Sequence, residues 1–230
     1  MIQENLIQAQ ENIINACKRV GRNPDDVTLI AVSKTKPLSM IEEAYASGMR
    51  EFGENKPQEM RDKAKAFDFP VHWHMIGTLQ SNKIKYVVGT ACMIHSVDSI
   101  ALASAIEKEA AKKELVMDVL LEVNVAEEDS KHGFTVDELY SVVKEIAVFS
   151  HLKLRGLMTV APYTENAEEN RIYFKKMKEL LVDINSKNID NISMDCLSMG
   201  MSSDYEVVIE EGATMVRIGT GIFGERDYSH

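Results

Sequence analysis

Residues 27–48, VTLIAVSKTKPLSMIEEAYASG, contain the unit from which the rest of the chain is built. The apolar, β-branched run 27–33 is typical of a strand that is buried on both faces of a parallel sheet. Pro37 follows it, and Ser39 with Glu42 has the spacing of a capping box for a helix that Gly48 ends. The stretch therefore predicts one strand followed by one helix.

The same order of strand and helix recurs along the chain. Further strands are expected at 50–52, 72–76, 92–95, 116–123, 153–158, 193–197 and 214–218. Helical patterns occur at 57–67, 81–87, 100–112, 136–148 and 167–184, and Thr135 with Glu138 and Ser203 with Glu206 give two more capping boxes. Strictly alternating strands and helices with apolar strands indicate a parallel sheet.

Eight such repeats predict a single (β/α)₈ TIM barrel, with an open doubly wound sheet as the alternative. Only GTGIFGERDYSH follows the last strand, which is too short and too glycine-rich for a full closing helix. Apolar residues at helical spacing predict an extra helix over the first twenty residues, and we expect it to fill that place. Because no linker-like segment interrupts the chain, we expect one domain over residues 1–230.

The composition narrows the class of protein. The chain has 230 residues, of which 45% are apolar, and a net charge of −10. This acidic balance disfavours bulk binding to nucleic acid or to an anionic membrane, although a local positive pocket remains possible. No apolar run reaches the length of a membrane span, and the N-terminus lacks the pattern of a signal peptide.

The three cysteines, Cys17, Cys92 and Cys196, are far apart in sequence and form no CxxC motif. Their odd number and spacing suggest neither a disulfide framework nor a zinc site. We expect each to be a buried, reduced thiol, and we therefore expect the protein to be cytoplasmic.

Chemistry in a parallel barrel is expected at the carboxyl ends of its strands. Lys34 follows the first strand directly. It is either a desolvated amine that can form an imine with a carbonyl compound or a solvated lysine in a loop. Lys36, two residues further on, either disfavours the charged form of Lys34 by like-charge proximity or is a surface charge.

A candidate anion site follows the last two strands. Gly219-Thr220-Gly221 offers backbone N–H groups and a hydroxyl, and Ser202 and Ser203 lie near an expected helix N-terminus. The alternative for the serines is simple helix capping. Because the last two loops of such barrels commonly bind phosphate, the two features together favour a phosphate pocket.

Arg217 lies in the apolar run of the last strand, so it needs a partner. That partner is either a neighbouring acid or a ligand in the barrel mouth. His72 and His74 share one strand face, but no third residue has metal-ligand spacing, so we interpret them as structural histidines. Residues 219–224 match GxGxxG, but the chain ends before the helix, strand and acidic residue that a dinucleotide site requires.

Seven motifs resemble one family, the pyridoxal-phosphate homeostasis proteins, which are stand-alone relatives of the alanine racemase N-terminal barrel. They are AVSKTKP (31–37), FGENKPQE (52–59), WHMIGTLQSNK (73–83), IHSVDS (94–99), GLMTV (156–160), LSMGMSSD (197–204) and VRIGTGIFG (216–224). They span nearly the whole chain in the order found in the family. The departures are small, such as Thr78 where the family often has histidine.

The resemblance implies a fold-type-III barrel that binds pyridoxal 5′-phosphate (PLP) as an internal aldimine. Lys34 matches the Schiff-base lysine, and Arg217 matches the arginine near the pyridine nitrogen. Phosphate contacts fall on Ser202, Gly219 and Thr220. Pocket positions fall on Asn55, His74, Ile76 and Met199, and auxiliary lysines fall on Lys36 and Lys131.

The resemblance also implies a carrier that buffers PLP and delivers it to PLP-dependent apo-enzymes, with no dedicated catalytic cycle and no metal. The alternative is a PLP-dependent amino-acid racemase, which needs a second base opposite Lys34. A third possibility is a barrel without any cofactor. Since no long exposed apolar stripe requires a dimer, we expect a monomer.

Overall fold

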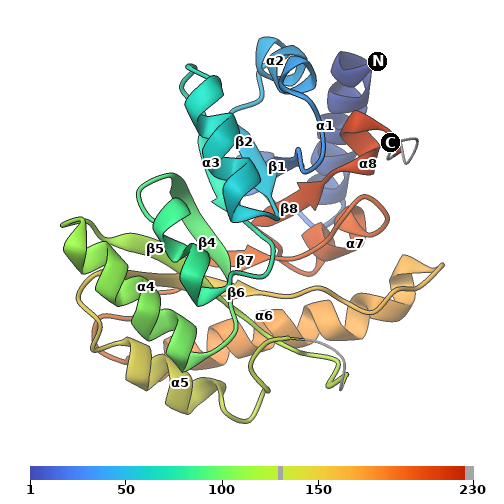
Figure 1. The fold of residues 1–230 in the computed structure, drawn as a ribbon. Coiled ribbons are helices and arrows are strands. Elements are labelled where there is room, and N and C mark those ends of the chain that lie inside the picture. The colour runs from blue at the N-terminus through green and yellow to red at the C-terminus, as the bar shows by residue number, and fades with distance from the viewer. Residues whose placement is uncertain (129–131, 226–230) are drawn as a thin grey trace.

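The structure is a computed structural model that describes residues 1–128 and 132–225. Eight parallel strands close into a barrel in which neighbours along the chain are neighbours in the sheet, and β8 pairs with β1 (Figure 1). The strands are β1 (Thr28–Val32), β2 (Glu51–Glu54), β3 (His72–Met75), β4 (Ala91–Val97), β5 (Met117–Glu122), β6 (Leu152–Met158), β7 (Cys196–Ser198) and β8 (Met215–Ile218). This confirms the predicted TIM barrel.

Helices form the outer layer and connect successive strands (Figure 1). They are α1 (Ile2–Arg19), α2 (Leu38–Ala46), α3 (Pro57–Ala66), α4 (Ile100–Lys112), α5 (Leu139–Ile146), α6 (Arg171–Ser186), α7 (Tyr205–Glu210) and α8 (Thr220–Phe223). Three short 3₁₀ segments accompany them, namely η1 (Pro24–Asp26), η2 (Ser81–Tyr86) and η3 (Ala167–Asn170). The expected helix over 81–87 is thus a 3₁₀ segment.

The N-terminal helix completes the outer layer where the chain ends, as expected. Because α8 has only four residues, it cannot cover β8 and β1 alone. Helix α1 packs against α2, α7 and α8, and Asn5 donates to the carbonyl of Ile222 at 2.9 Å. Leu6, Ile13 and Cys17 are among the residues that this helix buries.

The three expected capping boxes do not form. Helix α2 begins at Leu38 with Pro37 as its N-cap, and no side chain caps it. The Thr135 hydroxyl donates to the Glu138 carboxylate at 2.6 Å. This bond lies before the first residue of α5, and no side chain caps that helix. Before α7, the N-cap is Asp204, whose carboxylate accepts the N–H of Met201 instead of a helical N–H.

The thiols differ in part from the expectation. All three cysteines are free, and Cys17 and Cys196 are buried, but Cys92 at the start of β4 is exposed. In the part of the chain that the structure describes, no helix combines the length and apolarity that crossing a bilayer would require.

Candidate functional site

A cavity of about 460 Å³ lies at the carboxyl ends of the strands, in the size range of roughly 300–1,000 Å³ that is usual for small-molecule sites. Its wall combines apolar side chains with cationic and hydroxyl groups. It is formed by Val32, Lys34, Asn55, Ile76, Val160, Met201, Ser202, Ser203, Arg217, Gly219 and Thr220. The barrel thus brings residues from both ends of the chain to one mouth.

Lys34 is half-buried in the turn after β1, and a buried ionic network holds this turn from below. The ammonium of Lys63 on α3 donates to the carbonyl of Ser33 and to Glu54, both at 2.7 Å. The Ser33 hydroxyl donates to the same Glu54 oxygen at 2.6 Å. Burial raises the pKa of Glu54, while the positive charge of Lys63 opposes that rise.

The residue after Lys34 has an unusual backbone. Thr35 has φ of 63°, in the left-handed region that non-glycine residues seldom adopt. The Glu59 carboxylate accepts the Thr35 N–H at 2.6 Å and also bonds Lys63 at 2.7 Å. Hydrogen bonds on both sides of Lys34 therefore fix its backbone before any ligand arrives.

Glycine allows the next part of the wall to approach. A Cβ at Gly77 would lie 2.5 Å from the backbone oxygen of Asn55. Real Cβ contacts of that length do not occur, so only glycine permits this packing after β3. This close packing holds two residues of the cavity wall in place: Asn55, and Ile76, which directly precedes Gly77.

Three hydrogen-bonding groups converge where the loops after β7 and β8 meet. The Thr220 hydroxyl donates to the Ser202 hydroxyl at 3.1 Å, and the N–H of Gly221 donates to the same oxygen at 3.2 Å. Thr220 is exposed and Ser202 is partly exposed, so this corner is open to a ligand. Such hydroxyl and N–H groups suit the oxygens of a phosphate.

Arg217 on β8 is buried in the wall of the same cavity. Its guanidinium donates to the Ser198 hydroxyl at 2.6 Å and to the Thr159 carbonyl at 2.9 Å. Burial lowers its pKa to about 10, while the carboxylates of Asp204 and Glu122 oppose this shift. Both acceptors are neutral groups, so within the described part of the chain Arg217 is held by hydrogen bonds and not by the ion pair that was one of its two expected roles.

The structure separates some of the other predicted residues from the cavity. His74 and Met199 are buried and do not line it. Lys36 directs its ammonium to the carbonyls of Phe223, Gly224 and Glu225 at 3.0–3.2 Å, so it secures the end of α8. Lys131 lies outside the described residues.

Sequence reasoning missed three residues of the wall: Val32, Val160 and Met201. All three lie within motifs that the sequence analysis quoted, at or just after the ends of β1, β6 and β7, and Ser203 lies in the wall beside Ser202 as the candidate anion site predicted. Their position directly after strands was a usable signal, but their apolar or common side chains carried no chemical one.

His72 and His74 both bond Glu51, at 2.6 Å and 2.7 Å, in agreement with a structural role. Cys92 lies beside this pair. A carboxylate oxygen of Glu51, a ring nitrogen of His74 and the sulfur of Cys92 are potential metal ligands, and they lie within 4.8 Å of one another. The carboxylate of Glu51 already occupies the Nε2 side of His74. The hydrogen bonding of this group is therefore satisfied without an ion.

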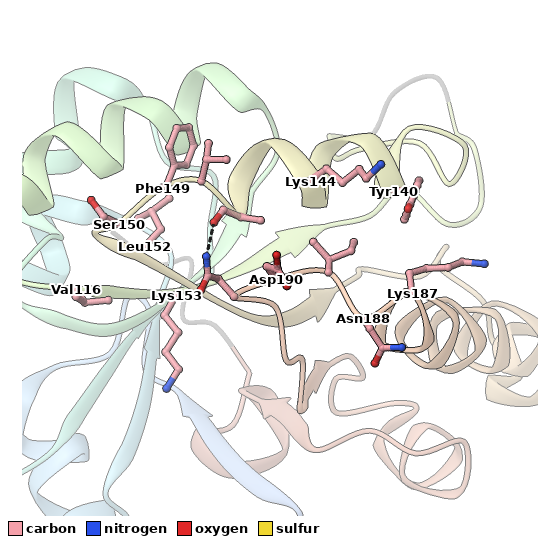
Figure 2. Close-up of a pocket in the computed structure, with 14 residues that line it drawn as sticks. Val116, Tyr140, Lys144, Phe149, Ser150, Leu152, Lys153, Lys187, Asn188 and Asp190 are labelled. Atoms are coloured by element: carbon pink, nitrogen blue, oxygen red, sulfur yellow. Dashed lines mark hydrogen bonds between the residues drawn. The ribbon is translucent and has the colours of Figure 1, made fainter.

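A larger hollow of about 890 Å³ lies elsewhere on the surface, between α5, β6 and the end of α6 (Figure 2). Asn191 bridges its two sides by donating to the carbonyl of Ala147 at 3.5 Å. Lys144 lies over the Tyr140 ring at 4.8 Å from its centroid. The wall has exposed lysines and valines but no converging set of buried polar groups, so size alone does not make it the functional site.

Comparison with known proteins agrees with this geometry. The family model described as the alanine racemase N-terminal domain matches residues 5–227. A pyridoxal phosphate homeostasis protein of Aquifex aeolicus is 45% identical over 226 residues, which cover 98% of each chain.

Among solved structures, PipY of Synechococcus elongatus with PLP bound has a TM-score of 0.85 and 33% identity, over 97% of this chain and all of that one. An alanine racemase of Clostridium difficile matches with a TM-score of 0.76 but only 12% identity, over 99% of this chain and 57% of that one, and so shares the fold alone. With a family model and a close relative that both span nearly its whole length, this chain belongs to the pyridoxal phosphate homeostasis proteins of the alanine racemase N-terminal domain family.

Proposed function

We propose that this chain binds PLP and takes part in PLP homeostasis, buffering the free cofactor and delivering it to apo-enzymes. The observation that carries the proposal is one cavity in which Lys34, Arg217 and the hydroxyls of Ser202 and Thr220 line the same wall. The names of the relatives, and the PLP bound to PipY, support the choice of ligand.

The residues present fit this cofactor. An amine, a guanidinium and a corner of hydroxyl and N–H groups match an aldehyde, a ring nitrogen and a phosphate in chemical type. The bound cofactor would supply an electrophilic aldehyde and an aromatic ring that accepts electrons. The apolar side chains of Val32, Ile76 and Val160 would exclude water from the ring.

Each polar residue then has a separate task. Lys34 would offer its amine to the aldehyde, and the hydrogen bonds around Ser33 and Thr35 hold its backbone in place. Ser202, Gly219 and Thr220 would hold the phosphate, while Asn55 and Ile76 would line the space for the ring. His74 and Met199 lie behind the wall, so we give them no direct contact.

Arg217 favours a carrier over an enzyme. A guanidinium has no acceptor atom, so a ring nitrogen held by Arg217 would stay unprotonated and the ring would withdraw electrons less strongly. Among the described residues, the cavity wall has no tyrosine, histidine or carboxylate that could act as a second base opposite Lys34. A racemase remains the second candidate, favoured by the shared fold.

The remaining expectations have weaker support. The free thiols of Cys17, Cys92 and Cys196 support a reducing compartment such as the cytoplasm. The closure of β8 onto β1 and the packing of α1 against α7 and α8 support the proposal of one domain over 1–230. Monomeric state and delivery to apo-enzymes stay predictions.

The deciding experiment is borohydride reduction of the protein with PLP, followed by peptide mapping. We expect the cofactor on Lys34 and none on Lys36, which lies two residues away but is bound to three carbonyls. Lys34→Ala should retain its circular dichroism spectrum and lose the adduct. Trapping on another lysine would refute the assigned site, and rapid racemisation of an amino acid by the purified protein would favour the enzyme.

A further inference from the structure

Five polar residues on five different strands are linked by hydrogen bonds through the interior of the barrel. His74 Nε2 lies 2.7 Å from a Glu51 carboxylate oxygen, and His74 Nδ1 lies 2.9 Å from His95 Nε2. His95 Nδ1 lies 2.9 Å from the Ser198 hydroxyl, which in turn accepts from Arg217 at 2.6 Å. The five residues belong to β2, β3, β4, β7 and β8, the strands labelled in Figure 1.

The path runs from one end of the barrel to the other. Its inner members His74, His95, Ser198 and Arg217 are at most 4% exposed. Glu51 lies at the first residue of β2, paired with His72 at the first residue of β3, which is the end of the barrel opposite Lys34. Glu51 is partly exposed there and also bonds His72, whose side chain is largely exposed.

The chemistry of the end groups sets the direction of the hydrogen bonds. Arg217 can only donate, so Ser198 accepts from it. The Ser198 proton then needs an acceptor, and among the described residues His95 Nδ1 is the one within reach. Burial and the nearby charges hold the pKa of His95 well below its usual value, so its ring is neutral.

The hydrogen bonds of His95 and His74 continue in the same direction. With Nδ1 accepting, His95 carries its proton on Nε2 and donates to His74 Nδ1. His74 then carries its proton on Nε2 and donates to the Glu51 carboxylate. Every donor therefore points the same way, from a buried cation to a carboxylate, which is the arrangement in which successive hydrogen bonds strengthen one another.

We infer that Glu51, His74, His95 and Ser198 are positioning residues for Arg217, forming a one-way hydrogen-bonded relay that orients its guanidinium in the cofactor cavity and balances its charge from the far end of the barrel. This inference rests on the proposed PLP site and adds a set of residues that do not touch the ligand. Because arginine does not release its proton at ordinary pH, the relay orients and polarises the guanidinium and does not transfer protons.

The consequence for the ligand follows from the donors of Arg217. Ser198 accepts an N–H of Nη1 and the Thr159 carbonyl accepts an N–H of Nη2, so two of the five N–H groups are used. The remaining donors are free to meet an acceptor atom of the ligand in the cavity that Arg217 lines. Loss of the negative charge on Glu51 would weaken the hold on the guanidinium without changing any residue of the cavity wall.

The first test needs no ligand. Nitrogen-15 NMR of the imidazole rings of the wild-type protein should show His95 neutral with its proton on Nε2, and His74 donating from its Nε2. A proton on Nδ1 of His95 would reverse the direction of the relay and overturn the inference. This result is independent of whether the protein binds PLP.

The second test compares Glu51→Gln with Glu107→Gln. Glu107 bonds His151 at 3.0 Å on the outside of the barrel and lacks a path to Arg217, so it is a matched glutamate–histidine pair. We expect Glu51→Gln to weaken PLP binding by at least about threefold and to shift the absorption spectrum of the bound cofactor, because members of one network are coupled. Glu51→Asp should recover part of the loss, and Glu107→Gln should match the wild type.

The outcomes separate the two proposals. If Glu51→Gln and Glu107→Gln bind PLP with equal affinity and give the same spectrum, the relay inference fails while the PLP function stands. If the wild type does not bind PLP, the proposed function fails, and the tautomers of His74 and His95 still decide whether the directed relay exists. Melting temperatures of both variants identify any loss of binding that comes from unfolding alone.

Discussion

Lys63→Met removes the cation from the buried network beneath the Lys34 turn. The Lys63 side chain is 10% exposed and Glu54 is fully buried, and their charged atoms are 2.7 Å apart. Removing one partner of a buried ion pair typically costs about 3–5 kcal/mol, because the other charge is left uncompensated. We expect the lower end, about 3 kcal/mol, since the Ser33 hydroxyl continues to donate to Glu54 and methionine fills most of the space.

The loss should depend on pH in a defined direction. Burial already raises the pKa of Glu54, and Lys63 opposes that rise, so its removal raises the pKa further. A carboxyl whose pKa is higher in the folded than in the unfolded state adds stability below its unfolded pKa, and this contribution is lost as pH rises through the folded pKa. The destabilisation should therefore be largest at neutral and alkaline pH, and it should shrink as the pH falls toward the ordinary pKa of a glutamate side chain.

Urea denaturation followed by circular dichroism measures this prediction. Lys65→Met is the matched control, because Lys65 is exposed on the same helix α3, and we expect its free energy of unfolding to stay within about 0.5 kcal/mol of the wild type. Lys63→Met should also bind PLP more weakly, since Lys63 holds the Ser33 carbonyl next to Lys34. If both variants unfold at the same urea concentration as the wild type, the ionic network does not stabilise the turn.

Three further substitutions test the site and its surroundings. Thr220→Val should lower the affinity for PLP and for inorganic phosphate about tenfold with little change in melting temperature, because Thr220 is exposed and bonds Ser202; an equal loss of melting temperature would count against a binding role. Gly77→Ala should cost about 1–3 kcal/mol of unfolding free energy and weaken PLP binding, since its Cβ would lie 2.5 Å from the Asn55 oxygen; unchanged denaturation would show that the backbone can shift. Ser99→Ala should cost about 1 kcal/mol in denaturation without altering PLP affinity, because its hydroxyl caps α4 by accepting the Leu102 N–H; a changed affinity would contradict this separation.

The sequence alone was sufficient for the barrel and for most of the cavity wall. Eight repeats of an apolar strand and an amphipathic helix favoured a closed parallel barrel over an open doubly wound sheet. That closure brings the carboxyl ends of all strands to one mouth, so Lys34, Ser202, Arg217 and Thr220 could be grouped from their positions after strands. The position of a residue relative to the end of its strand was therefore enough to predict that it lies at the mouth of the barrel.

Local motifs were less informative where the surrounding fold controls the backbone. The spacing of Ser39 and Glu42 matched a capping box, but Pro37 already takes the N-cap position of α2. A motif records which hydrogen bonds are possible, whereas the route of the chain out of the preceding strand decides which of them form. The same reason explains why Asp204, and not Ser203, precedes α7.

Only the tertiary structure identified the interior contacts. His95 and Ser198 are 103 residues apart and meet across the barrel lumen, and neither residue type carries a sequence signal for that contact. No sequence motif singled out Lys63, yet it is buried against Ser33 and Glu54. Strand periodicity says which side chains point inward, but which inward side chains touch depends on strand tilt and register, and these exist only once the barrel has closed.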